Sequence, residues 1–218
     1  MQSALYKGSD QQRIIAMLIK EYPDAKYYLN FSTPIDLAAA AIISAQTRDE
    51  VVNSLTPALF KRFKSASDYA GAQEDELAKY ISKVSFAQNK AKNIIAACKI
   101  IQERHKGRVP DKIEDLVELP GIGRKTANTI LINAYGKVAG IPVDTWVMKL
   151  SMRMGLSTKK DPDKIEQDLM AIVEKRYWGR FGYILKAHGK KICQSQIPLC
   201  SKCILLKICP RNGVKKSA

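Results

Sequence analysis

The chain has 218 residues, which is long enough for one large domain or for two small domains that share an interface. Hydrophobic residues make up 46% of it, enough for a packed core, and this excludes wholesale disorder. Its 36 Lys and Arg against 21 Asp and Glu give a formal charge of +15. Such an excess favours a polyanionic partner, most often nucleic acid, although a solubilising surface or an anionic membrane would also explain it.

The sequence shows no targeting or membrane-spanning pattern. The N-terminal stretch MQSALYKGSDQQ lacks the apolar core and the cleavage site of a signal peptide. The longest apolar run, LAAAAIISA at 37–45, is too short to span a bilayer. We therefore expect a soluble intracellular protein without a membrane partner.

Nearly every periodic stretch of the chain predicts a helix. Ser9, Thr33 and Asp161 stand where N-caps are expected; the first has a glutamine three residues on, and the other two precede a proline. The stretch 86–107 is long and amphipathic, with basic residues near its end and Gly107 as a stop. No alternating β-branched run predicts a strand. The fold class is therefore all-α, with about nine to eleven helices.

Residues 112–136, KIEDLVELPGIGRKTANTILINAYG, predict a short helix, a tight glycine turn and a second, more apolar helix. Gly121 and Gly123 allow positive φ and let a phosphate approach the backbone amides without a Cβ in the way. The free N–H groups at the start of the second helix also favour a phosphate oxygen. This pattern indicates a helix-hairpin-helix that grips a nucleic-acid backbone; an ordinary tight turn between packed helices is the alternative.

Lys125 lies in the first turn of that second helix, directly after Arg124. The helix dipole and the neighbouring cation both disfavour an ammonium group, so we expect a lowered pKa for Lys125. A partly neutral lysine can form a Schiff base with a sugar carbon, although a simple phosphate contact would suit the same position. Asp144, in GIPVDTWVMKL, could take the lysine's proton or stabilise positive charge on the deoxyribose; capping a helix is its alternative role.

Four of the five cysteines, Cys193, Cys200, Cys203 and Cys209, follow the spacing C-x6-C-x2-C-x5-C near the end of the chain. Four thiolates in so short a segment could hold zinc or a cubane iron–sulfur cluster. Structural zinc sites more often use two C-x2-C pairs, and this segment has one, so the spacing favours iron–sulfur. The fifth, Cys98, is expected to pack in the core.

Together, the hairpin LPGIGRKTAN, the PVDT stretch, IISAQTRD and the closing HGKKICQSQIPLCSKCILLKIC resemble endonuclease III, a DNA glycosylase and AP lyase of the helix-hairpin-helix superfamily. The resemblance runs roughly from Arg13 to Pro210. It implies two helical domains with a DNA-binding cleft between them. Residues 27–137 would form a six-helix barrel with the helix-hairpin-helix, and residues 1–26 with 138–218 would form the iron–sulfur cluster domain.

The resemblance also implies roles for individual residues. By motif match, Lys125 would be the nucleophile and Asp144 its catalytic carboxylate. Gln46 would fill the hole left by the flipped nucleotide, and Phe86 would be the apolar wedge on the opposite strand. Gly121, Gly123 and Arg124 would contact DNA, and the four clustered cysteines would hold a 4Fe-4S cluster. Asp49 is expected to be structural, and neither His105 nor His188 is expected to be catalytic.

The implied function is base excision repair by a bifunctional DNA N-glycosylase and AP lyase, which removes oxidised pyrimidines and nicks the strand by β-elimination. Its partner would be double-stranded DNA with damaged bases or abasic sites, bound by a monomer in the cytoplasm or nucleoid. The alternatives are a monofunctional mismatch-specific glycosylase, which would lack the hairpin lysine, and a non-catalytic DNA-binding protein. Trp146 and Ser85 stand where the family usually has His and Gly, which leaves the lesion preference open.

Overall fold

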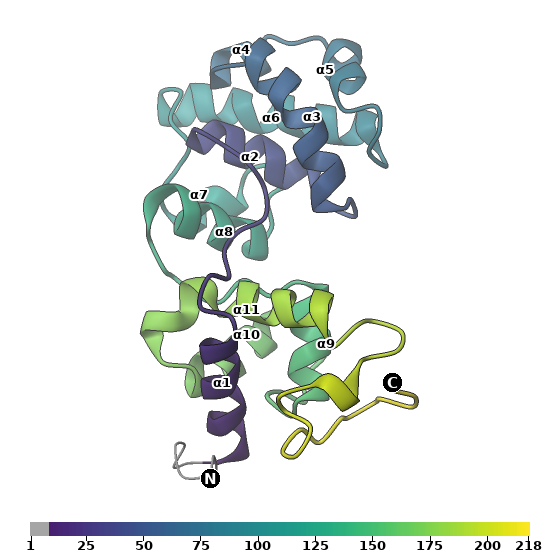
Figure 1. The fold of residues 1–218 in the computed structure, drawn as a ribbon. Helices are drawn as coiled ribbons and strands as arrows, with labels where there is room; N and C mark the ends of the chain where they lie inside the picture. The colour runs from purple at the N-terminus through teal and green to yellow at the C-terminus, as the bar shows by residue number, and fades with distance from the viewer. Residues whose placement is uncertain (1–8) are drawn as a thin grey trace. The chain divides into compact units, whose positions relative to one another are not determined.

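A computed structural model describes residues 9–218 (Figure 1). Over this range the chain is helical and forms no strand, which confirms the all-α class. It divides into two compact units: Tyr28–Ala139, and the described residues up to Tyr27 together with Gly140–Ala218. None of the described helices is long and apolar enough to cross a membrane.

The unit Tyr28–Ala139 is arranged around α2 (Pro34–Ile43), a helix that is buried on every side from Ile35 onward. Its run of alanines keeps α2 thin, so that neighbouring helices can pack closely against it. Three helices contact it: α3 (Asp49–Arg62), α6 (Ala87–His105) and α8 (Arg124–Tyr135). The shorter helices α4 (Ala66–Ala70) and α5 (Glu74–Tyr80) pack on α6, and α7 (Ile113–Val117) packs on α8.

The predicted helix ends of this unit are confirmed by their backbone geometry. Thr33 caps α2: its hydroxyl accepts the N–H of Asp36 at 3.2 Å, and the Asp36 carboxylate accepts the N–H of Thr33 at 3.0 Å. Such a reciprocal pair satisfies two N–H groups that the helix itself leaves free. The long α6 ends at His105, and Gly107 follows it with φ +77°, as expected for the glycine stop.

The second unit combines the first helix, α1 (Asp10–Glu21), with the C-terminal part of the chain. That part contains α9 (Thr145–Arg153), α10 (Pro162–Ile172), the 3-10 turn η1 (Lys175–Tyr177), α11 (Trp178–Lys191) and the 3-10 turn η2 (Cys200–Lys202). Both expected caps are present, Ser9 in a capping box on α1 and Asp161 before Pro162 on α10.

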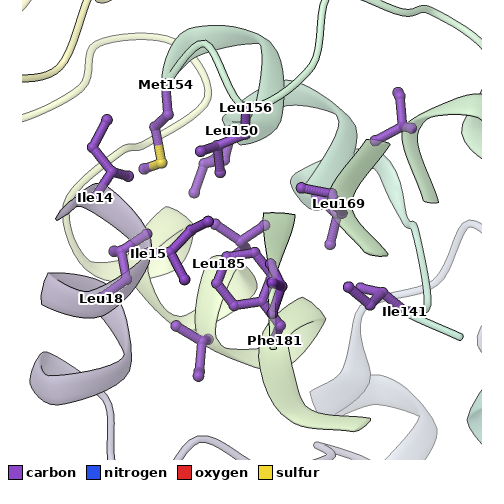
Figure 2. Packing of buried hydrophobic residues seen from close by; sticks show 14 of the residues in the cluster. Ile14, Ile15, Leu18, Ile141, Leu150, Met154, Leu156, Leu169, Phe181 and Leu185 are labelled. Carbon is purple, nitrogen blue, oxygen red and sulfur yellow. The ribbon is translucent and has the colours of Figure 1, made fainter. Parts of the chain in front are cut away.

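One apolar core holds this unit together. Ile14 and Leu18 of α1 meet Leu150 of α9, Leu169 of α10 and Phe181 of α11 in a single buried cluster (Figure 2). Burial of a side chain of this size contributes roughly 1.5–3 kcal/mol. The core therefore binds α1 firmly to helices that lie more than a hundred residues later in the sequence.

Candidate functional site

The glycine hairpin between α7 and α8 uses its two glycines differently. Gly121 has φ +81°, and a Cβ there would lie 3.2 Å from side-chain carbons of both Asn93 and Ile42. Gly123 is the N-cap of α8 with φ −89° and ψ 177°, and a Cβ there would meet nothing within 4 Å. The expectation of positive φ is thus right for Gly121 and wrong for Gly123. The absence of a side chain at Gly123 leaves open space in front of the start of α8.

The start of α8 is the positive end of the helix dipole. No side chain caps it, and its first turn contains no acidic residue. Arg124 is exposed there, and Lys125 is half-buried, with its carbonyl accepting the Thr129 hydroxyl at 2.9 Å. The N–H groups of the helix end, the helix dipole and two cations combine at this point. The arrangement attracts an anion such as a phosphate and brings the Lys125 amine next to it.

Asp144 is the N-cap of α9, so its structural role is present. Its Oδ1 atom accepts both cap hydrogen bonds, from the N–H groups of Trp146 and Val147, each at 2.9 Å. The cap therefore does not use Oδ2 of this half-buried carboxylate. Beyond the cap, the Trp146 ring packs against Gly189 of α11, where a Cβ would lie 2.4 Å from a ring carbon. This departure from the family pattern is thus accommodated by a glycine.

Gln46 and Phe86, the two residues expected to insert into DNA, share a strained backbone conformation. Gln46 lies in the turn between α2 and α3 with φ +54°, and Phe86 precedes α6 with φ +60°. A left-handed residue other than glycine costs of order 1–3 kcal/mol and persists only where its surroundings hold it. Gln46 is exposed, and Phe86 is 69% exposed although it is a large apolar residue.

Ser85, the second departure from the family pattern, does not need to be a glycine here. Ser85 does not have a positive φ; the residue in the left-handed conformation is Phe86, which follows it. Asp49 is the first residue of α3, where a carboxylate suits the positive helix end.

Lys90 is a buried lysine that the sequence analysis did not single out. It belongs to the first turn of α6, it is only 6% exposed, and burial lowers the pKa of its ammonium group. Its Nζ atom donates to the carbonyls of Ile43 at 2.7 Å and Ala45 at 2.6 Å, and to the Thr47 hydroxyl at 2.9 Å. These acceptors satisfy all three donors of an ammonium group. They also lie on both sides of Gln46.

The four clustered cysteines line one cavity that is open to solvent. Its volume, including the part open to solvent, is ≈ 360 Å³. In the described part of the chain, no group of three or more His, Cys, Asp or Glu side chains is arranged to hold a metal ion. The four thiols thus line one shared space without forming a site for a single metal ion. Burial raises the pKa of the Cys203 thiol to about 11 and also raises that of Cys209.

Arg153, at the end of α9, holds the first part of the cysteine loop, by which we mean residues 193–209. Arg153 is 7% exposed, and its guanidinium donates to the carbonyls of Cys193 at 3.2 Å, Gln194 at 2.7 Å and Ser195 at 2.9 Å. It also lies 3.4 Å from the Cys193 sulfur. Arg153 therefore places a positive charge beside the cavity.

The two histidines have structural positions. His188 is buried on α11, where its Nδ1 atom shares a hydrogen bond of 2.9 Å with the Tyr22 hydroxyl and its Nε2 atom lies 3.6 Å from the Cys203 sulfur. Burial lowers the pKa of His188 to about 4. It therefore links the end of α1 to the cysteine loop. His105 is the last residue of α6, and Cys98 is buried as expected.

Lys90 and Arg153 are the functional candidates that sequence reasoning missed. A usable signal existed for Lys90, because it lies four residues before Ile94 and eight before Cys98, on the apolar face of α6. A lysine on the apolar face of a helix is expected to be buried with hydrogen-bond or ionic partners, because lysine is almost never buried without them. For Arg153 the local pattern offers no such signal, because a basic residue in the last turn of a helix is common.

The sequence and the fold both match known proteins. Residues 39–175 match the family described as "HhH-GPD superfamily base excision DNA repair protein". Endonuclease III of Synechocystis sp. is 44% identical over 214 residues, covering 96% of this chain and 98% of that protein. Endonuclease III of Bacillus subtilis is 39% identical over 196 residues, covering 89% of each.

A solved structure described as a trapped endonuclease III–DNA covalent intermediate superposes on this chain with a TM-score of 0.88. The two sequences are 34% identical, and the match covers 94% of this chain and 97% of the other. The likeness therefore extends through both units of the fold.

Proposed function

This chain belongs to the endonuclease III family of the HhH-GPD superfamily of base excision DNA repair proteins, and we propose that it removes oxidised pyrimidines through a Schiff base on Lys125. As a member of that family it is a DNA glycosylase with AP lyase activity. The observation that carries the proposal is the position of Lys125, half-buried in the uncapped first turn of α8 directly behind the glycine hairpin.

The hairpin suits a role in holding the DNA backbone. Gly121 makes the tight turn, Gly123 leaves the amides at the start of α8 open, and Arg124 adds an exposed positive charge. A phosphate held there would bring its own deoxyribose within reach of Lys125. Exposed Gln46 and Phe86 would enter the base stack, because a base inside a duplex must be flipped out before its glycosidic bond can be attacked.

The Lys125 amine then attacks C1′ of the damaged nucleotide. A bond forms between Nζ and C1′, and the glycosidic bond breaks with its electron pair on the base, which takes up a proton. Opening of the sugar ring gives a protonated Schiff base. This withdraws electrons from C2′, so that loss of a C2′ proton expels the 3′-phosphate and nicks the strand. We assign Asp144 to accepting the lysine's proton and to stabilising positive charge on the sugar.

The cysteine cavity suits a 4Fe-4S cluster as the resident cofactor. Four thiols from one loop line a single space, which is the ligand set such clusters use, and the Arg153 guanidinium lies beside it. We propose that Cys193, Cys200, Cys203 and Cys209 hold the cluster. When bound, it would cross-link the cysteine loop and make it rigid, and no step of the reaction passes through it.

Borohydride trapping tests the catalytic assignment. Two duplexes are used, one with a single thymine glycol and one with a single abasic site, against wild type, Lys125→Ala and the charge-matched Lys112→Ala. Lys112 is exposed and lies at the start of the same hairpin. We expect a covalent protein–DNA adduct from wild type and Lys112→Ala, and none from Lys125→Ala, whose DNA affinity stays close to that of wild type.

Two outcomes would contradict the proposal. No adduct from wild type on either duplex would leave a monofunctional glycosylase or a DNA-binding protein. An adduct from the abasic duplex but no release of thymine glycol would keep Lys125 as the nucleophile and reject oxidised pyrimidines as the substrate class. Iron content and visible absorbance of the purified protein, compared with Cys203→Ser, test the cofactor independently.

A further inference from the structure

Lys90 lies between the two strained segments that carry Gln46 and Phe86, and it contacts one through its backbone and the other through its side chain. Its backbone N–H donates to the Phe86 carbonyl at 3.0 Å and so closes the first turn of α6. Its Nζ atom reaches the turn between α2 and α3, where it holds the Ala45 carbonyl and the Thr47 hydroxyl. Lys90 thereby contacts Phe86 and both chain neighbours of Gln46.

The chemistry of these contacts explains why the turn can keep its conformation. Ile43 is the last residue of α2, and its carbonyl is one of those that a helix leaves without an internal partner. An ammonium group satisfies that carbonyl and complements the negative end of the helix dipole. The same group fixes the residues before and after Gln46, so the left-handed backbone between them is held from both sides.

We propose that Lys90 is a positioning residue that presents Gln46, in a fixed relation to Phe86, for insertion into the DNA duplex. Neither DNA nor the reacting atoms need to touch Lys90. Its contribution is to arrange in advance two side chains that must enter the base stack together. This inference rests on the DNA-inserting roles proposed above for Gln46 and Phe86.

The role predicts a loss that depends on the substrate. Lys90→Met keeps much of the chain length and the apolar contacts but removes every donor. On a thymine glycol duplex, where insertion is required, we expect a fall of about 10- to 100-fold in kcat/KM, because small misplacements of positioning groups have effects of this size. On a single-stranded abasic oligonucleotide, which has no stack to enter, borohydride trapping should stay within about twofold of wild type.

Three further variants keep the test specific. Lys99→Met removes the same charge from an exposed position of α6 and should leave both substrates unaffected. Thr47→Val removes one acceptor of the Lys90 ammonium group, together with the bond that the hydroxyl donates to the Ala45 carbonyl at 3.3 Å. It should give a weaker form of the duplex defect, which guards against misfolding of Lys90→Met. In a Gln46→Ala background, Lys90→Met should add little to the duplex defect, because residues that act through one another are not additive.

Hydrogen exchange supplies a readout that does not depend on activity. The amides of residues 44–48 should exchange faster in Lys90→Met than in wild type or Lys99→Met. Unchanged exchange there, an equal loss on both substrates, or full additivity with Gln46→Ala would each overturn the inference. A Gln46→Ala variant with wild-type duplex activity would overturn it through the role of Gln46, whereas the failure of wild type to trap single-stranded DNA would instead reject the lyase mechanism.

Discussion

The Trp146 ring lies so close to Gly189 that an added methyl group there should destabilise the folded protein. A Cβ on Gly189 would lie 2.4 Å and 2.8 Å from two carbons of the Trp146 ring, against the 3.5–4.0 Å at which carbon atoms pack. Overpacking of this kind typically costs about 1–3 kcal/mol. Replacing glycine by alanine inside a helix also stabilises the helix, by up to about 1 kcal/mol. We therefore expect Gly189→Ala to destabilise the protein by about 1–2 kcal/mol.

The assay is thermal unfolding of four proteins: wild type, Gly189→Ala, Trp146→Ala and the double variant. For a protein of this size, Gly189→Ala should lower Tm by about 2–8 °C. In the Trp146→Ala background the ring is gone, so only the helix preference remains and the same substitution should become neutral or slightly stabilising. AP lyase activity should also fall in Gly189→Ala, because the Trp146 N–H donates to Asp144.

Gly71→Ala is the matched control, because its Cβ would meet only the Ser67 carbonyl oxygen, at an ordinary 3.5 Å. It should change Tm by about 1–2 °C at most. The reasoning is refuted if Gly189→Ala costs the same with and without the Trp146 ring. In that case the ring moves aside freely, and the packing of Trp146 does not depend on the glycine.

The other glycine, charge and pH predictions concern separate parts of the fold. Gly121→Ala should destabilise the protein by about 1–3 kcal/mol in urea unfolding, because it combines positive φ with two close carbons, whereas Gly123→Ala should unfold like wild type and raise KM for duplex DNA. Arg153→Met should lower the free energy of unfolding by about 3 kcal/mol and the bound iron per protein, because three carbonyls of the cysteine loop lose their donor. The Lys64 N–H holds the pKa of Asp68 below its usual value of 3.8, so this carboxylate stabilises the folded state above that pH and the stabilisation is lost as the pH falls through the lowered pKa. Asp68→Asn should therefore be less stable than wild type in urea at pH 7 and approach it below about pH 4; a constant difference would contradict the assignment.

Local sequence was sufficient for the helices and for the residue types of the site. The Ser9 and Thr33 caps, the stop at Gly107 and the helix that begins after Gly123 depend on interactions within a few residues, which a sequence pattern records directly. The same holds for Lys125, whose place in the first turn of α8 follows from the hairpin alone.

Other features arise only when distant segments fold against one another. Lys90 meets its acceptors near Gln46 because α6 packs on α2, and Arg153 meets the cysteine loop because that loop returns to α9. The path of the chain into α6 likewise sets the left-handed conformation of Phe86. Because that conformation falls at Phe86, position 85 can be a serine and does not require glycine. Pattern reasoning identifies which residues can do chemistry, since that depends on type and spacing. The tertiary fold decides which buried groups hold them in place, since hydrogen bonds between segments remote in sequence exist only after those segments pack.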